Sequence, residues 1–317
     1  MTIHRPPERA PGNNSAHRPG TAPDPVLAPL TGPQTAQLIR LALDAAGENG
    51  LHATFDGTDA LLLSPGPLLP QLSSDLVAGL SNLARVVAPE HPHRWPRLVH
   101  DHFNRLGAHL SDGPPPPPTD PTRDLIARLV PTTALPSSWT AGMPEFLPGL
   151  LAVPATHTDG VVTLHLDPND FGMTREDALD TALTNLRHHP DHVEHFTHEG
   201  ATITALSGST FAASRALVLD TVLRETLHTE NPPHGVLVAL PARSLLLIHV
   251  IDDLAILPAL AVMLGLSLRT HTTQPGPLTP WIHHVTAAGW SPATTQPDDL
   301  RSVHLTPALQ SLTRTLP

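Results

Sequence analysis

Stretches with apolar residues at three- and four-residue intervals alternate along the chain with stretches in which every second residue is apolar. The first helical stretch, PQTAQLIRLALDAAG over 33–47, places four apolar residues on one face: Leu38, Ile39, Ala42 and Ala45. Pro33 suits the first turn of such a helix, and Gly47 suits its end. The pattern therefore predicts a helix over 33–47.

The next segments predict a small α+β module at 33–110. LHATF and ALLLS flank DGTD, which is typical of a β-hairpin with Asp56 and Gly57 in its turn. Residues 71–87 form an amphipathic pattern that predicts a helix, and we expect another helix from Trp95 to Leu106.

In the second half of the chain, two short strands followed by a helix recur. LLAVPA and VVTLHL precede a helix at 174–187, where Thr174 and Asp177 suggest a capping box. VEHFTH and ATITAL precede a helix at 210–228, and GVLVAL and SLLLIHVI precede a helix that ends near Gly265. WIHHVT adds a strand, and a short helix follows near 306–315. These hairpin and helix repeats predict an α+β fold with a mostly antiparallel sheet and helices on one face.

Composition shifts divide the chain into four parts. Residues 1–32 are rich in proline, glycine and charge, so we expect a disordered arm before the module at 33–110. The segment SDGPPPPPTDPT at 111–122 favours polyproline II and predicts a linker, with docking to an aromatic groove as the alternative. The main α+β domain then covers 123–317.

The residue counts exclude several kinds of chemistry. The chain has 38 Pro and 22 His but no Cys, no Tyr and no Lys, which we interpret as the bias of a GC-rich bacterial genome. Without cysteine and lysine there is no disulfide, thiolate nucleophile, Cys-type zinc site or Schiff base. The formal net charge of −11 argues against nucleic-acid binding.

Hydropathy argues against a membrane protein. The longest apolar stretch, LAILPALAVMLGL at 254–266, is too short to span a bilayer and contains Pro258. The first residues lack the apolar core of a secretory signal. We therefore expect a cytoplasmic protein. We also expect no cofactor.

The segment HHPDHVEHFTHEG at 188–200 holds five histidines and three acids in thirteen positions. On one helix, four of these histidines could form a metal-binding face, but Pro190 interrupts it. As a strand, His192 and His198 would lie roughly 20 Å apart and could not bind the same ion. We interpret the segment as a solvated loop and strand without metal, and keep a metal-dependent hydrolase as an alternative.

Arg215 occupies an unusual position in the predicted helix at 210–228. At 100° per residue from Phe211, Val218 falls at about 340°, Val222 at about 20° and Arg215 at about 40°, inside the apolar arc. A guanidinium there needs acceptors, which could be a carboxylate, backbone carbonyls or an anionic ligand, unless it reaches out to solvent.

Three further residues are candidates for a binding site. Arg243 lies in the turn LPARS between two strands, and could meet Arg215 in one pocket or simply be exposed. No GxSxG, SxxK or GxGxxG motif is present, so we assign Ser207, Ser209 and Ser214 to turn and helix-start roles rather than to nucleophiles. Ser207 and Ser209 stay candidate binding residues with Arg215 and Arg243.

These residues also carry a resemblance to a known family. LSGSTFAASRALVLDTVL followed by GVLVALPARSLLLIHVI resembles the YtpQ-like family of bacterial proteins of unknown function, over roughly 145–270. Ala213-Ser214-Arg215 matches the family's ASR helix, and Leu240-Pro241-Ala242-Arg243 its VPNR-like turn, with Ala242 in place of asparagine. LTNLR at 183–187 is similar to the family's ALENL helix. The resemblance implies no activity.

Two functions follow as the main expectations. The first is a non-enzymatic binding or adaptor protein with a protein partner, because no catalytic constellation is visible. The alternative is an enzyme or small-ligand protein that binds an anionic group through Arg215 and Arg243. The sequence leaves the oligomeric state open.

Overall fold

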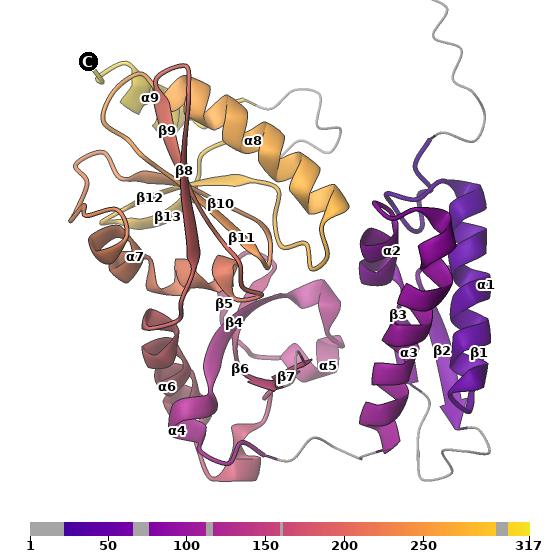
Figure 1. The fold of residues 1–317 in the computed structure, drawn as a ribbon. Coiled ribbons are helices and arrows are strands. Elements are labelled where there is room, and N and C mark those ends of the chain that lie inside the picture. Colours follow the sequence, from indigo (N-terminus) through magenta and orange to yellow (C-terminus); the bar gives the residue numbers. More distant parts are fainter. Residues whose placement is uncertain (1–21, 66–75, 112–116, 159–160, 296–303) are drawn as a thin grey trace, which may run out of the picture.

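The computed structural model describes residues 22–65, 76–111, 117–158, 161–295 and 304–317, which form two units (Figure 1). The N-terminal unit contains the three-stranded sheet β1-β2-β3, and the C-terminal unit contains a four-stranded and a six-stranded sheet. All strand pairs among the described residues are antiparallel and helices pack against them, so the α+β class is confirmed. In the described ranges, no helix is both long and apolar enough to cross a membrane.

The N-terminal unit builds its own hydrophobic core. Helices α1 (Gly32–Glu48) and α3 (Trp95–Ser111) pack side by side over the hairpin of β1 (Leu51–Phe55) and β2 (Ala60–Pro65). The fully buried side chains at its centre include Leu38, Leu61, Trp95 and Phe103. The predicted hairpin and both of these helices are confirmed.

The helix predicted over 71–87 is wrong in its first half. Residues 71–75 lie outside the described residues, and β3 (Leu76–Gly79) pairs with β2 before α2 (Ser81–Val87) begins. The pairing satisfies backbone groups that a helix would have satisfied internally, so tertiary contacts override the helical pattern. A 3-10 turn, η1 (Pro92–Arg94), leads into α3.

The end of the expected disordered arm is ordered. Leu27 and Leu30 are 0% and 1% exposed and belong to the N-terminal core. The carboxylate of Asp24 accepts hydrogen bonds from the backbone N–H groups of Val26 and Leu27, which fixes the turn. These two leucines order the segment by burying their apolar side chains. Composition did not indicate this, because the leucines lie among prolines and glycines.

The four-stranded sheet contains a strand that the pattern did not predict. Strand β4 (Ile126–Pro131) pairs along its length with β6 (Leu150–Thr158), which also pairs with β5 (Glu145–Leu147) and β7 (Val161–Leu164). Helix α6 (Arg175–Arg187) covers this sheet through its alanine and leucine face. Thr174 caps α6 as predicted, because its hydroxyl oxygen accepts the Asp177 N–H at 3.1 Å.

Short elements connect this sheet to its surroundings. Helix α4 (Pro121–Asp124) precedes β4, and η2 (Thr132–Ala134) and α5 (Ser137–Thr140) follow it. The turn η3 (Pro168–Phe171) leads into α6.

The six-stranded sheet has the order β13-β12-β10-β11-β9-β8. Its strands are β8 (His192–His198), β9 (Ala201–Ser207), β10 (Val236–Ala242), β11 (Leu245–Val250), β12 (Ile282–Thr286) and β13 (Gly289–Pro292). The predicted strand segments are confirmed here. The expectation of a single main sheet was wrong, because β6 pairs with β4 and does not join these strands.

Helices lie on both faces of the six-stranded sheet, so the expectation of one covered face was also wrong. Leu237 and Ala239 of β10 pack with α8 (Ile256–Thr273) and α9 (Pro307–Thr313). Val236 and Val238 point the other way and pack with η4 (Ala212–Val218) and α7 (Leu219–Glu225). Figure 1 shows α8 and α7 on opposite sides of the strands. A strand that is apolar at every position, as β10 is, has no face left for solvent.

The predicted helix at 210–228 is not one continuous α-helix. Its first part, η4, is a 3-10 helix, and Val218 with φ −125° and ψ 43° separates it from α7. Six of the seven residues of η4 are buried, since η4 lies between the two sheets. Helix α8 runs past Gly265 to Thr273, because Gly265 does not adopt the left-handed conformation with which a glycine ends a helix.

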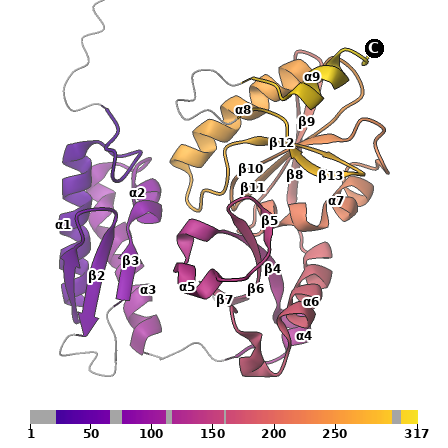
Figure 2. The ribbon, with the colours of Figure 1, turned by 180° about the vertical axis from the view of Figure 1, so that it is seen from behind.

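The two units meet where α2 faces the loop after α8 (Figures 1 and 2). The Arg85 guanidinium donates to the Thr272 carbonyl through Nε at 3.2 Å. The Gly276 N–H donates to Asn82 Oδ1 at 2.8 Å. These polar contacts join α2 of one unit to the end of α8 and the loop after it in the other.

Candidate functional site

Arg215 is buried and paired, as its place among apolar residues indicated. It is 4% exposed, and its Nε donates to Asp191 Oδ2 at 2.7 Å. Its Nη1 donates to the carbonyls of Leu186 and, at 2.9 Å, Arg187, at the C-terminal end of α6. A cation suits this end of a helix, where the last carbonyls lack partners within the helix. Arg215 therefore fixes α6 to η4.

The two residues before Arg215 also connect separate elements. The Ala213 N–H donates to the Arg243 carbonyl at 3.1 Å, and the Leu129 N–H donates to Ser214 Oγ at 2.9 Å. Three consecutive residues of η4 thus reach the β10–β11 turn, strand β4 and the segment after α6. The run Ala213-Ser214-Arg215 holds the C-terminal unit together.

Arg243 lies at a small cavity that Arg215 does not line. The cavity has a volume of about 320 Å³, and its lining residues are Gly208, Ser209, Thr210, Arg243, Ser244 and Pro275. It forms where three connections converge: the turn after β9, the turn between β10 and β11, and the loop after α8. We call it the arginine cavity.

A second arginine lies directly behind the wall of this cavity. Arg128 of β4 is 8% exposed, and its Nη1 donates to Thr210 Oγ1 at 3.3 Å. Since the Thr210 oxygen accepts from Arg128, its own hydroxyl proton is available to a group in the cavity. The positive charge of Arg128 polarises the Thr210 hydroxyl, which makes this hydroxyl a stronger hydrogen-bond donor to a group in the cavity.

The charges of these two arginines are not compensated. Among the residues that the structure describes, neither guanidinium pairs with a carboxylate. Burial and, to a smaller extent, the nearby charge of Arg243 lower the pKa of Arg128 to about 10. Burial also lowers the pKa of Arg243. Both groups stay protonated at neutral pH, so the site carries two positive charges that an anion would stabilise.

The ring of Phe211 organises the side chains behind the cavity. The Arg128 guanidinium carbon lies 5.3 Å from the centre of this ring. The ring of His189 lies 5.4 Å from it, centre to centre. His189 Nε2 is 3.4 Å from Ser209 Oγ, which accepts the Phe211 N–H at 3.0 Å. A histidine and a serine thus join the arginines at one site.

The structure brings together some of the predicted site residues. Arg243 and Ser209 line the same cavity, whereas Ser207 ends β9 opposite His192 and does not line it. Arg215 is engaged with Asp191 and does not converge with Arg243. Arg128 was not predicted as a site residue, because β4 was not predicted. The available signal was a short apolar run, IARLVP, with an arginine between Ala127 and Leu129.

The histidine-rich segment forms an edge strand with a polar surface. His192, His195 and His198 of β8 are all exposed, and His195 Nδ1 is 2.9 Å from Thr204 Oγ1 on β9. Within the described ranges, no group of three or more His, Asp or Glu side chains lies close enough to hold a metal ion.

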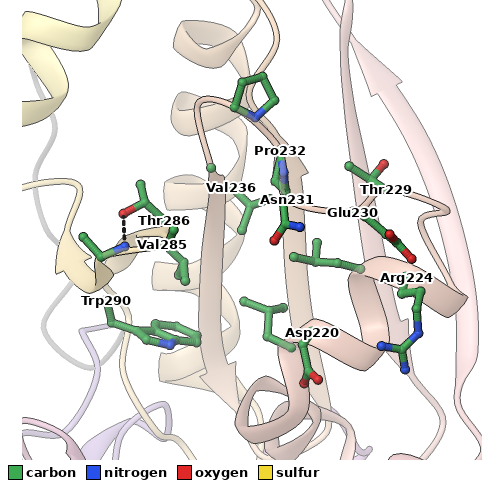
Figure 3. Close-up of a pocket in the computed structure, with 16 residues that line it drawn as sticks. Asp220, Arg224, Thr229, Glu230, Asn231, Pro232, Val236, Val285, Thr286 and Trp290 are labelled. Carbon is green, nitrogen blue, oxygen red and sulfur yellow. Dashed lines mark hydrogen bonds between the residues drawn. The ribbon is translucent and has the colours of Figure 1, made fainter.

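A larger cavity of about 710 Å³ lies beside α7 and shares no lining residue with the arginine cavity. Figure 3 shows Val285, Thr286 and Trp290 along one side and Asp220, Arg224 and Glu230 along the other. Its floor is apolar and its rim carries charges of both signs. Nothing in the described part of the chain indicates what would fill it, so the adaptor hypothesis stays a prediction.

Comparison with known proteins leaves the site to be interpreted from its own geometry. No family model, no curated protein and no solved structure matches this chain. The resemblance to the YtpQ-like family stays a prediction.

Proposed function

We propose that the protein binds a small anion, or the anionic group of a larger molecule, in the arginine cavity. The observation that supports this proposal is the pair of uncompensated charges of Arg128 and Arg243 beside one cavity. Burying a cation without a partner is unfavourable, so such an arrangement is typical of a site that a ligand completes. The proposal keeps Arg243 and Ser209 as binding residues and replaces Arg215 by Arg128.

The cavity contains donors suited to phosphate or carboxylate oxygens. Arg243 presents a planar guanidinium that can donate two parallel hydrogen bonds. Ser209 and Thr210, which carry hydroxyl groups, line the same cavity. A volume of about 320 Å³ is at the small end of ligand sites, which favours a compact anion or one end of a larger ligand.

Arg243 is held in place by the loop after α8. A side-chain carbon on Gly276 would lie 2.5 Å from Arg243 Cδ, so the stem of the arginine packs directly on this glycine. The Arg243 N–H also donates to the Gly276 carbonyl at 2.8 Å. The guanidinium is thus positioned before a ligand arrives, which reduces the entropy lost on binding.

Calorimetric titration with inorganic phosphate tests the proposal. We expect saturable binding to the wild-type chain and roughly 10- to 100-fold weaker binding to Arg243→Gln, the loss of a charge-assisted hydrogen bond. Arg128→Gln should weaken binding less, because Arg128 acts through Thr210. Arg224→Gln, an exposed arginine on α7, is the matched control and should bind like the wild type.

The effect on stability separates a binding role from a structural one. If the arginines serve a ligand, Arg243→Gln should leave the free energy of unfolding unchanged or raise it, since repulsion with Arg128 is relieved. Absence of saturable phosphate binding at millimolar concentrations by the wild type would overturn the proposal. Equal phosphate affinity of the wild type and Arg243→Gln would do the same.

A further inference from the structure

Ser209 of the arginine cavity lies beside a histidine, His189, which does not itself line the cavity. The hydroxyl of Ser209 lines the cavity and lies 3.4 Å from His189 Nε2. We propose that Ser209 and His189 form a catalytic pair that hydrolyses esters carrying an anionic group, which Arg243 and Thr210 hold. This inference rests on the proposed function, because the same cavity positions the substrate.

The hydrogen bonds of His189 give its ring the right protonation for a base. Nδ1 lies 3.0 Å from the Pro190 carbonyl, which can only accept, so Nδ1 carries the proton. In the neutral imidazole, Nε2 then has a free lone pair that points at Ser209 Oγ. A base oriented by a third group is the arrangement that activates serine nucleophiles. Catalytic hydrogen bonds of this length commonly shorten once substrate is bound.

The Ser209 oxygen is also oriented. It accepts the Phe211 N–H at 3.0 Å, which leaves its own proton to donate to His189. His189 packs on the Phe211 ring, on which Arg128 also packs. One aromatic ring therefore positions both the base and the cation that polarises Thr210.

The backbone places Ser209 at a sharp turn between β9 and η4. Gly208 has φ +85°, and a side-chain carbon there would lie 3.0 Å from His192 Cβ. Only glycine fits this conformation without strain. Ser209 follows this turn at the wall of the arginine cavity, where its oxygen accepts the Phe211 N–H and lies 3.4 Å from His189 Nε2. No GxSxG motif is needed for this geometry.

The reaction balances without any added co-reactant except water. Ser209 Oγ attacks the ester carbonyl carbon while its proton moves to His189 Nε2. The ester C–O bond then breaks, the leaving alkoxide takes the proton from His189, and an acyl-Ser209 remains. Water attacks this acyl group, gives a proton to His189 and releases the acid, and Ser209 regains its proton.

The two positive charges favour an anionic over a neutral substrate. An ester with a carboxylate can pair with Arg243, whereas a neutral ester would leave that guanidinium unpaired in the bound state. The positive charge also stabilises the negative charge that develops on the carbonyl oxygen. The substrate class is therefore a small ester with a carboxylate or phosphate substituent.

The test uses 4-acetoxybenzoate and its neutral methyl ester as matched substrates for the full chain. We expect hydrolysis of 4-acetoxybenzoate with kcat/KM at least about 10-fold higher than for the methyl ester. Ser209→Ala and His189→Gln should each lower kcat by at least about 100-fold. His188→Gln, which changes the exposed neighbour, should leave hydrolysis unchanged.

Mass spectrometry of the wild-type chain after an acid quench gives a readout independent of how the variants fold. We expect an acetyl group on the peptide that contains Ser209. If no acetyl group forms there, or if Ser209→Ala hydrolyses the ester at the wild-type rate, the catalytic inference is wrong.

Phosphate titration separates the two proposals. If the wild type and Ser209→Ala bind phosphate but no turnover occurs, the anion site stands and only the catalytic pair is refuted. If the wild type binds no phosphate, the proposed function fails, and the catalytic inference fails with it.

Discussion

Arginines of two kinds lie close together in the C-terminal unit, Arg128 and Arg215 buried and Arg243 partly buried. Arg215 has a carboxylate and two carbonyls as partners, whereas Arg128 and Arg243 have no carboxylate partner among the described residues. A buried charge with a partner helps to hold the fold together. A charge without a partner destabilises the unliganded protein, and binding of an anion offsets this cost. The two kinds therefore respond in opposite directions when one charge is removed.

Asp191→Asn should lower the free energy of unfolding by about 3–5 kcal/mol, because it leaves the Arg215 guanidinium buried without its counter-charge. Chemical denaturation monitored by circular dichroism measures this change. Asp220→Asn, at the exposed ion pair with Arg187, is the control and should lower stability by no more than about 1 kcal/mol. A loss as small as the control's for Asp191→Asn would contradict the structural role of the pair.

His283 gives the protein a pH dependence at the residue scale. It is 5% exposed, and burial lowers its pKa to about 4. Since the folded pKa lies below the unfolded value of about 6.5, stability is fully present above about pH 6.5 and falls as pH drops toward 4. The loss from this group amounts to about 3 kcal/mol.

His283→Gln should therefore flatten the decline of unfolding free energy between about pH 6.5 and pH 4. Denaturant titrations at a series of pH values measure the slope. His188→Gln, which changes an exposed histidine, should leave the slope as in the wild type. An unchanged slope in His283→Gln would show that this histidine is not held neutral by burial.

At the scale of elements, η4 connects the two sheets of the C-terminal unit. It contacts β4 of the four-stranded sheet, β9, β10 and β11 of the six-stranded sheet, and α6. A 3-10 helix has about three residues per turn, so Ala212, Arg215 and Val218 share one side. All three are buried, which a solvent-exposed helix would not allow.

Ser214→Ala should destabilise the protein by about 1–3 kcal/mol, because the buried Leu129 N–H loses its acceptor. Urea unfolding measures the effect. The matched control is Ser291→Ala on the exposed strand β13, where we expect a change within about 0.5 kcal/mol. If both variants behave alike, the bond between η4 and β4 does not stabilise the fold.

The sequence predicted elements with a strong local pattern and missed those that depend on distant partners. The strand pairs at 192–207 and 236–250 alternate or run apolar and were predicted correctly. Strand β4 and η4 were not, since pairing with β6 and burial between sheets leave no periodic signal. At the site, the burial of Arg215 followed from its neighbours, whereas Arg128 meets Thr210 only through a contact 82 residues apart in sequence.

At the scale of the whole molecule, a polar path runs from the N-terminal unit to the arginine cavity. Asn82 of α2 accepts the Gly276 N–H, and the carbonyl of Gly276 accepts the Arg243 N–H. The stem of Arg243 packs on Gly276 as well. The N-terminal unit, none of whose described residues lines the cavity, therefore supports Arg243 through Gly276.

Asn82→Ala should weaken phosphate binding by a few-fold, roughly 2- to 10-fold, the effect of one hydrogen bond, because Gly276 loses its anchor. Calorimetric titration measures the affinity. Asn104→Ala, on the exposed surface of α3 in the same unit, is the control and should bind phosphate like the wild type. Unchanged affinity in Asn82→Ala would show that the loop after α8 positions Arg243 without help from α2.

The Gly276 peptide makes the two halves of the molecule thermodynamically dependent on each other. If docking of α2 tightens the grip of Arg243 on an anion, then by reciprocity the bound anion tightens the docking of α2 by the same factor. An anion bound in the cavity of about 320 Å³ thereby strengthens the association between the N-terminal and C-terminal units.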